Sequence, residues 1–155
     1  MLKSADLLSQ SGCYVLLLRN RKQQTLHVGK FGDIEFSKGY FAYTGSAFGP
    51  GGIKARVGRH LRSSHKKHWH IDHIKTAMDI EAVWLIYTDK RIEHQCAQLC
   101  GELKGAQVAW PGFGSSDCHC VSHLYFYLHA PSFRSFSMRF KKENVAGDVK
   151  RCAAR

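Results

Sequence analysis

Apolar residues along the chain gather in short continuous runs that Gly, Pro and polar residues separate. The runs at 13–19 (CYVLLLR) and 81–87 (EAVWLIY) are typical of strands buried in a sheet, because they are short and mostly apolar. Turn residues bound the other strand candidates, and Gly45 ends one of them. The pattern predicts strands at residues 13–19, 25–30, 33–36, 40–43, 81–87 and 123–129, the second and third forming a hairpin around Phe31-Gly32.

Three segments have the apolar spacing of helices rather than of strands. They cover about 53–63, 68–78 and 91–103, and Gly105 ends the last one. The order of elements is therefore β, β, β, β, α, α, β, α, β, with a Gly/Ser-rich loop at 111–117. This order predicts a small α/β (α+β) domain, in which a mixed, mainly antiparallel sheet is flanked by helices.

The length and composition agree with one folded domain. The chain has 155 residues, of which 44% are apolar, and domains most often have about 100–150 residues. No apolar run approaches the roughly 20 residues that span a bilayer, and residues 1–12 lack the features of a secretory signal. We therefore expect a cytoplasmic protein that binds no membrane, associated with the nucleoid if its source is prokaryotic.

Positive charge is concentrated in two parts of the chain. With 23 Lys and Arg against 12 Asp and Glu, the net charge is +11. Residues 52–75 hold seven of the cations and one carboxylate, and residues 139–155 hold six cations and two carboxylates. Such clustering is typical of a surface that binds a polyanion, most commonly nucleic acid. The candidate nucleic-acid-binding residues are Lys54, Arg59, Arg62, Lys66 and Lys67; the alternative is a solvated helix face.

The six cysteines do not suggest a disulfide framework, because the chain is long enough for a core and shows no secretory signal. Cys96 and Cys100 lie four apart in a helical segment and are expected to be small core residues. Cys118, Cys120 and His123 carry ligand atoms that suit zinc, although their spacing is not the usual Cys-x2-Cys pair. A zinc site and a structural turn are the two interpretations, and we favour the turn.

Two helices place charged groups where apolar residues are expected. In the first, Arg56 and His60 lie beside the apolar stripe, whereas Lys54, Arg59 and Arg62 point toward solvent. A cation at the border of a core needs a partner, either a structural carboxylate or a substrate phosphate. In the helix from residue 91, Glu93 falls in the middle of the apolar face. Its carboxylate is expected either to pair with Arg56 or to bind a metal.

These residues resemble the motifs of the GIY-YIG nuclease superfamily. Gly12-Cys13-Tyr14 corresponds to the Gly-Ile-Tyr of that family, and Tyr43-Thr44-Gly45 corresponds to its Tyr-Ile-Gly. The family next places an Arg, often followed by a His four residues on, in the helix after the second motif, where this chain has Arg56 and His60. A later helix of the family carries one metal-binding Glu, matched here by Glu93.

A closer resemblance is to a branch of this superfamily that occurs alone or fused to endonuclease III-type repair enzymes. It rests on residues 40–52 (YFAYTGSAFGPGG), 68–72 (HWHID) and 111–118 (PGFGSSDC). It implies a nuclease domain at residues 11–130, followed by a basic, partly disordered C-terminal extension at 131–155. The interval from Tyr14 to Tyr43 is longer than is usual in the family, because a second hairpin is inserted, and Cys13 and Thr44 replace aliphatic residues.

The resemblance implies a divalent-metal-dependent DNA endonuclease that acts in repair, recombination or defence. Glu93 would hold Mg²⁺ or Mn²⁺, and Arg56 would bind the scissile phosphate. Tyr14 or Tyr43 would take the proton from the attacking water, helped by a nearby cation or by His60. DNA, branched or damaged in some cases, is the expected partner, with a repair protein as a second candidate; the sequence does not indicate an oligomeric state.

A histidine-rich segment follows the first helix and has two interpretations. His68, His70 and Asp72 are candidates for an accessory phosphate-binding or proton-transfer group. The alternative is an exposed helix start that Trp69 anchors in the core. Two other functions also compete with the nuclease: a non-catalytic nucleic-acid-binding module of the same fold, and an interaction domain stabilised by zinc.

Overall fold

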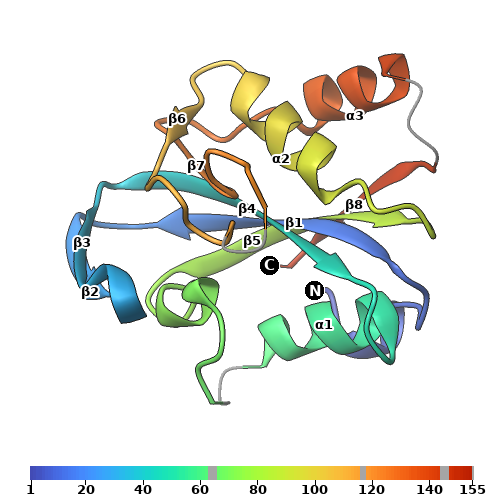
Figure 1. Cartoon of the computed structure of the whole chain (residues 1–155), viewed down its shortest axis with the longest axis horizontal. Helices are drawn as coiled ribbons and strands as arrows, with labels where there is room; N and C mark the ends of the chain where they lie inside the picture. The colour runs from blue at the N-terminus through green and yellow to red at the C-terminus, as the bar shows by residue number, and fades with distance from the viewer. Residues whose placement is uncertain (63–65, 116–117, 144–146, 155) are drawn as a thin grey trace.

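The computed structural model describes residues 1–62, 66–115, 118–143 and 147–154. Its centre is a six-stranded sheet with strand order β6-β7-β4-β1-β5-β8, and each of its pairings is antiparallel. A separate two-stranded hairpin stands at one end (Figure 1). The strands are β1 (Gly12–Asn20), β2 (Gln24–His27), β3 (Asp33–Phe36), β4 (Gly39–Ala47), β5 (Asp79–Tyr87), β6 (Gln107–Val108), β7 (Leu124–Tyr127) and β8 (Val149–Ala153).

Helices cover both faces of the sheet. Helix α1 (Gly52–Leu61) lies against one face, and α2 (Glu93–Glu102) and α3 (Phe133–Lys142) lie against the other (Figure 1). Short 3-10 turns occur at Ser4–Asp6 (η1), Gly29–Phe31 (η2) and His70–His73 (η3). Within the described residues, no helix is long and apolar enough to cross a membrane.

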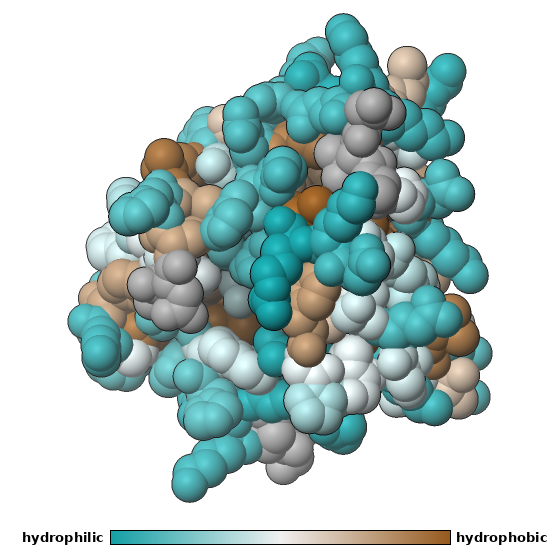
Figure 2. Space-filling model, turned by 45° about the vertical axis from the view of Figure 1, so that its right-hand side comes forward, coloured by the Kyte–Doolittle hydropathy of each residue, from teal (hydrophilic) through white to brown (hydrophobic). Residues whose placement is uncertain are grey.

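The central strand β1 divides the interior into two cores. Tyr14, Leu16 and Leu18 belong to the core beneath α1, whereas Cys13 and Val15 belong to the core beneath α2 and α3. This split follows from the period of two in a strand, which turns successive side chains to opposite faces. Hydrophilic side chains cover most of the surface shown in Figure 2, interrupted by small separate hydrophobic patches. The predicted class, a mixed and mainly antiparallel α/β fold, is confirmed.

The strand predicted at 40–43 extends further than expected, from Gly39 to Ala47. Gly45 does not end it, because Gly45 pairs with Tyr14 within the β1–β4 ladder. Glycine commonly ends a strand because it lacks a side chain to pack, but here that lack makes room for the neighbouring tyrosine. The extension matters for function, because it carries Ser46 past the region where β7 pairs with β4 and into the lining of a pocket.

The prediction of a helix at 68–78 is wrong. Only His70–His73 form a 3-10 turn, and bends and turns follow. The Asp72 carboxylate accepts hydrogen bonds from the backbone N–H groups of His68 and Trp69, at 2.7 and 2.9 Å. An aspartate that binds its own preceding backbone in this way favours a turn over a continuing helix.

The C-terminal residues belong to the domain, so their separation as an extension is corrected. Phe136 and Phe140 of α3 are fully buried in the core that contains Trp84, and β8 pairs with β5 at the edge of the sheet. Ser132 caps the helix by accepting a hydrogen bond from the backbone N–H of Ser135 at 3.0 Å. The part of the expected disorder that concerns residues 144–146 and 155 lies outside the described residues.

Candidate active site

A pocket of about 400 Å³ opens beside β4, at the point where the pairing of β4 with β7 ends. The pairing of β7 with β4 covers residues 40–43 of β4, so its last residues lie beyond the end of β7. Helices α1 and α2 approach this point from opposite faces of the sheet (Figure 1). The pocket is lined by Tyr14, Tyr43, Gly45, Ser46, Phe48, Arg56, His68, Trp69, His70, Arg91, Glu93, His94, Gly114, Cys118 and His123.

Tyr14 and Tyr43 come from adjacent strands and turn toward the same face of the sheet. Tyr14 lies opposite Gly45, and a Cβ atom on Gly45 would stand only 2.4 Å from the phenol oxygen of Tyr14. Only glycine therefore fits in that part of the Tyr-Thr-Gly motif. Tyr43 packs edge-on against Phe113, with ring centroids 6.2 Å apart. Both phenols are thus held by packing at the base of the pocket.

Burial controls the protonation of both tyrosines. Removal from water disfavours the charged phenolate, and it raises the pKa of Tyr14 and of Tyr43 well above the usual value. The nearby Arg56 guanidinium acts in the opposite direction on each pKa, and the Glu93 carboxylate adds to the rise. Both tyrosines are consequently neutral at neutral pH, and additional positive charge in the pocket would favour their ionisation.

His60 lies behind Tyr14 and does not line the pocket. It is 2% exposed, and its Nε2 atom is 2.8 Å from the Tyr14 hydroxyl oxygen. Its Nδ1 atom is 3.2 Å from Nζ of Lys75. An ammonium group has only donors, so Lys75 donates to Nδ1, and the Nε2–H group of His60 donates to Tyr14. Burial, reinforced by the charge of Lys75, lowers the pKa of His60 to about 3.

Asp72 completes this network from the other side. Arg59 donates to its two carboxylate oxygens at 2.9 Å each, and Nζ of Lys75 lies 3.4 Å from one of them. Burial alone would raise the pKa of Asp72, but hydrogen bonds from Arg59 and from the backbone hold it far below its usual value. Burial lowers the pKa of Lys75 to about 8. Lys75 therefore remains mainly charged at neutral pH.

Two sequence predictions are corrected by this network. Arg59 does not point into solvent, because it binds Asp72 and stacks on Trp69, with its guanidinium carbon 4.4 Å from the ring centroid. Asp72 is not an accessory group of the pocket, because its side chain is fully buried against Arg59 and Lys75. Both changes follow from the turn at 70–73, which brings Asp72 against α1 instead of leaving it on an exposed helix.

Arg56 is positioned by two contacts at the edge of the pocket. One terminal nitrogen donates to the carbonyl oxygen of Ser46 at 3.0 Å, and the guanidinium carbon lies 4.5 Å from the Trp69 ring centroid. A guanidinium has five N–H donors, so this arrangement orients the group while leaving donors for a ligand. Trp69 is therefore not only a core anchor, because it stacks against both Arg56 and Arg59.

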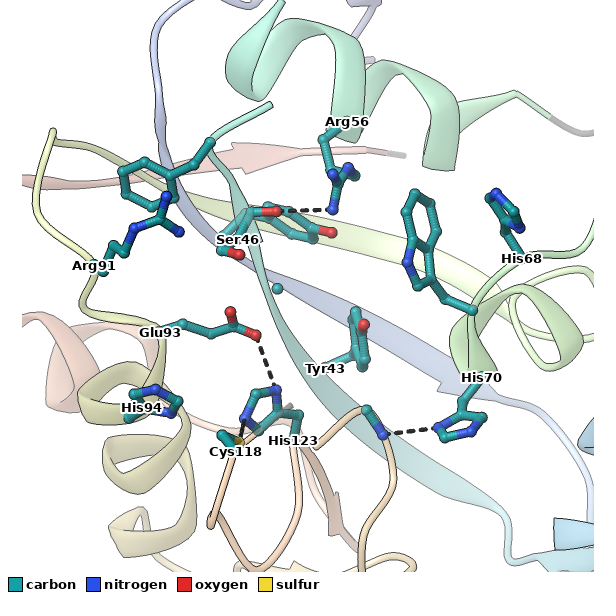
Figure 3. A pocket seen from close by; sticks show the side chains of 15 residues that line it. Tyr43, Ser46, Arg56, His68, His70, Arg91, Glu93, His94, Cys118 and His123 are labelled. Atoms are coloured by element: carbon teal, nitrogen blue, oxygen red, sulfur yellow. Dashed lines mark hydrogen bonds and ion pairs between the residues drawn. The ribbon is translucent and has the colours of Figure 1, made fainter. Parts of the chain in front are cut away.

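Glu93 is the first residue of α2, and its carboxylate points into the same space as Arg56 (Figure 3). Its Oε1 atom is 3.0 Å from Nδ1 of His123, so within the described residues the contact of this carboxylate is with His123 rather than with Arg56. Burial tends to raise the pKa of Glu93, but hydrogen bonds from His123 and Ser46 lower it below the usual value. The carboxylate is therefore charged, and its side chain is 24% exposed.

Several lining residues were not found from the sequence. Ser46 follows the Tyr-Thr-Gly motif directly, and Arg91 stands two positions before Glu93, so proximity to a motif was the available signal. Arg91 rests on the Phe48 ring, with its guanidinium carbon 4.6 Å from the centroid. His94 directly follows Glu93, so the same signal was available for it. Lys75 lies behind the pocket and gave no such signal, because its partner His60 is 15 positions away.

The remaining candidates divide between the pocket and the surface. His68 and His70 line the pocket, and Nδ1 of His70 accepts a hydrogen bond from the backbone N–H of Gly114 at 3.0 Å. Of the predicted nucleic-acid-binding residues, four are exposed and lie outside this pocket: Lys54, Arg62, Lys66 and Lys67.

All six cysteines are free thiols. Cys96 and Cys100 are fully buried, as expected of core residues. Cys118 and Cys120 lie with His123 and with His94, a residue that the sequence did not single out, and the four ligand atoms are all within 4.8 Å of one another.

Comparison with known proteins identifies a family and little else. A family model described as "Domain of unknown function DUF123" matches residues 13–145. No curated protein and no solved structure gives a significant match. The matched residues include β1, β4 and the three helices, and they contain the residues that line the pocket. Because the match covers most of the chain, the protein belongs to the family described as "Domain of unknown function DUF123".

Proposed function

We propose that the protein is a GIY-YIG-type, divalent-metal-dependent DNA endonuclease that hydrolyses phosphodiester bonds. One observation carries the proposal: Tyr14, Tyr43, Arg56 and Glu93 come from four different elements and line one pocket, with His60 directly behind Tyr14. The motif resemblance identifies the same set from separate parts of the sequence. A shared pocket is what a common chemical role requires.

Arg56 is suited to hold the scissile phosphate. Ser46 and Trp69 fix its guanidinium at the rim, and the remaining donors can contact two phosphate oxygens. Arg91 provides a second cation on the other side of the pocket, near Glu93 (Figure 3). Together they would attract the DNA backbone and neutralise charge that develops on the phosphate.

The donors around Glu93 fit a hard cation such as Mg²⁺ or Mn²⁺. Glu93 offers a charged carboxylate that keeps free lone pairs after contacting His123, and the Ser46 hydroxyl lies beside it. Mg²⁺ prefers oxygen ligands, keeps several waters and needs few protein groups. When bound, such an ion supplies charge stabilisation for the phosphate and the leaving oxygen.

Tyr14 is the better placed general base of the two tyrosines. Its oxygen accepts the N–H group of His60, and Arg56 opposes the rise in its pKa that burial causes. Both contacts favour the phenolate, which would accept the proton of the attacking water. His60 contacts the Tyr14 oxygen and lies outside the pocket, so we assign it the role of a positioning residue.

Exposed cations outside the pocket support binding of a larger anion. Lys54, Arg62, Lys66 and Lys67 lie on or just after α1, the helix that presents Arg56. Lysine and arginine side chains in water can approach a phosphate backbone without a desolvation cost as large as that of buried groups. We therefore propose DNA as the substrate, and a role in repair, recombination or defence.

The proposal is tested with a nicking assay on duplex, flap, junction and single-stranded DNA, with and without Mg²⁺. We expect cleavage by the wild-type protein, and a loss of at least about 100-fold in Glu93→Gln and Arg56→Gln, because each change removes charge stabilisation in the pocket. Glu102→Gln on the same helix and Arg134→Gln on α3 are matched controls, since both residues are exposed and lie outside the pocket. No cleavage of any substrate by folded wild-type protein would contradict the proposal.

A non-catalytic nucleic-acid-binding module is the second candidate. It is favoured by the raised pKa of both tyrosines, which leaves both phenols neutral at neutral pH. This candidate predicts DNA binding that weakens steeply with salt, and no cleavage product at any Mg²⁺ or Mn²⁺ concentration.

A further inference from the structure

Two histidines and two cysteines form a cluster at one wall of the pocket, where α2 begins. Nδ1 of His94 is 3.2 Å from Sγ of Cys120, and Nε2 of His123 is 3.3 Å from Sγ of Cys118. All four ligand atoms lie within 4.8 Å of one another. Figure 3 shows Cys118 next to the His123 ring, and His94 in the first turn of α2.

These distances are close to those of a tetrahedral zinc site. Zinc binds nitrogen and sulfur ligands at about 2.0–2.3 Å, so neighbouring ligand atoms lie roughly 3.3–3.8 Å apart in a tetrahedron. One pair, at 3.3 Å, is at the short end of that range, a second pair, at 3.2 Å, is just below it, and no pair exceeds 4.8 Å. Small side-chain rotations would therefore suffice to close the site around an ion.

The chemical nature of the ligands selects the metal. Two thiols and two imidazoles are soft or borderline donors, which suit Zn²⁺ and do not suit Mg²⁺. A complete set of four protein ligands is typical of a structural zinc site, whereas a catalytic site keeps one position open. The nitrogen and sulfur donors of this cluster distinguish it from the oxygen donors of Glu93 and Ser46.

Glu93 supplies an independent feature of such a site. Its carboxylate contacts Nδ1 of His123, so that ring can carry its proton on Nδ1 and present Nε2 as a ligand. Histidine ligands of metals usually donate their second N–H group to a carboxylate or carbonyl, which fixes the ring and its tautomer. The His123 ring is 2% exposed and therefore has little other freedom.

We propose that His94, Cys118, Cys120 and His123 bind one structural Zn²⁺ ion. This proposal takes the zinc interpretation of residues 118–123 in place of the structural turn, with His94 as the fourth ligand. The ion joins the start of α2 to the segment before β7, and through His123 it fixes the carboxylate of Glu93. The site does not depend on the proposed nuclease activity, and it would equally stabilise a binding module.

The test is the metal content of the purified full chain, measured by mass spectrometry after exchange into metal-free buffer. We expect about one zinc per chain in the wild type. The Cys118→Ser/Cys120→Ser variant should lose it. Co²⁺ added to the chain stripped of metal should give the absorption bands of tetrahedral thiolate coordination, and the double variant should not.

Two matched variants keep the test specific. His119→Ala removes an exposed histidine that lies between the two cysteines but outside the cluster, and Cys152→Ser removes a cysteine on β8. Both should retain zinc at the wild-type stoichiometry. Wild-type protein without zinc that also gives no Co²⁺ bands would overturn the proposal, as would full zinc retention in the double variant. Neither result depends on whether the protein cleaves DNA.

Discussion

Two buried histidines hold residues of the pocket in place. His60 lies behind the pocket and His123 lines it, and each contacts a residue that faces the pocket. His60 of α1 contacts Tyr14, and His123 contacts Glu93. Both histidines are 2% exposed. They differ in what the second ring nitrogen meets: for His60 it is the ammonium group of Lys75, and for His123 it is the thiol of Cys118.

This difference shows two ways to fix a histidine. On the α1 side, the charged groups are paired with one another, because Lys75 and Arg59 share the buried carboxylate of Asp72. On the α2 side, the hydrogen-bonding chain leads to thiols and a second imidazole, which together are a ligand set for a metal. The first side should therefore respond to charge and pH, and the second to metal supply.

The largest effect on the α1 side is expected from Asp72→Asn. The change leaves Lys75 and Arg59 without their shared charge, and breaking a buried ion pair costs about 3–5 kcal/mol. Urea unfolding measures the loss. Asp79→Asn is the control, because its pair with Arg21 is partly exposed and contributes about 0–1 kcal/mol. Equal effects of the two substitutions would show that the buried network is not what holds this side together.

The corresponding effect on the α2 side comes from the metal. A ligand that binds only the folded state stabilises it by about 2.7 kcal/mol at 100 times its Kd. Zinc added to metal-free wild-type protein should therefore raise the free energy of unfolding by at least this amount once it is well above Kd. The Cys118→Ser/Cys120→Ser variant should show no increase, whereas Asp72→Asn should still show it, which separates the two sides.

A smaller, pH-dependent effect is expected from His60. The unfolded chain protonates this residue near its usual pKa of 6.5, whereas the folded chain keeps it neutral down to about 3. Acid therefore favours the unfolded state, and the contribution of His60 to stability should fall by about 2 kcal/mol between pH 7 and pH 5. His60→Gln should lack this part of the pH dependence. If the difference in unfolding free energy between the two proteins is the same at both pH values, His60 titrates normally.

The smallest effect on stability is expected from Lys66→Ala/Lys67→Ala. Both side chains are exposed and lie outside both networks, so the free energy of unfolding should change by less than about 0.5 kcal/mol. If these lysines contact DNA phosphates, the slope of log affinity against log salt should fall by about 1.8, from roughly 0.9 for each contact. An unchanged slope, measured by fluorescence anisotropy, would place the DNA elsewhere on the surface.

The sequence predicted one side of the pocket better than the other. Arg56 and His60 were found because a spacing of four on a helix beside an apolar stripe is visible in one short segment. Glu93 was found for the same reason, on the apolar face of its helix. The partner of Glu93 was not, because His123 is 30 positions away and approaches only after α2 packs against the segment before β7.

Misjudged segments share a physical cause, which is that nearby charge hid a packing signal. In α3, basic residues surround Phe136 and Phe140 and mask their spacing of four, which is typical of a buried helix face. At 68–73, histidines suggested an exposed helix, although Asp72 was positioned to bind its own backbone. His94 lies 24 positions before Cys118, and no local pattern joins ligands so far apart.

The central claim is that Glu93 takes part in the reaction, whereas the cluster of His94, Cys118, Cys120 and His123 stabilises the structure. The most direct measurement is the single-turnover rate of DNA cleavage by a Glu93→Gln protein whose zinc content is determined in the same sample. The account predicts a folded protein that retains about one zinc per chain and cleaves at least about 100 times more slowly than the wild type. A zinc-loaded Glu93→Gln protein that cleaves at the wild-type rate would contradict it.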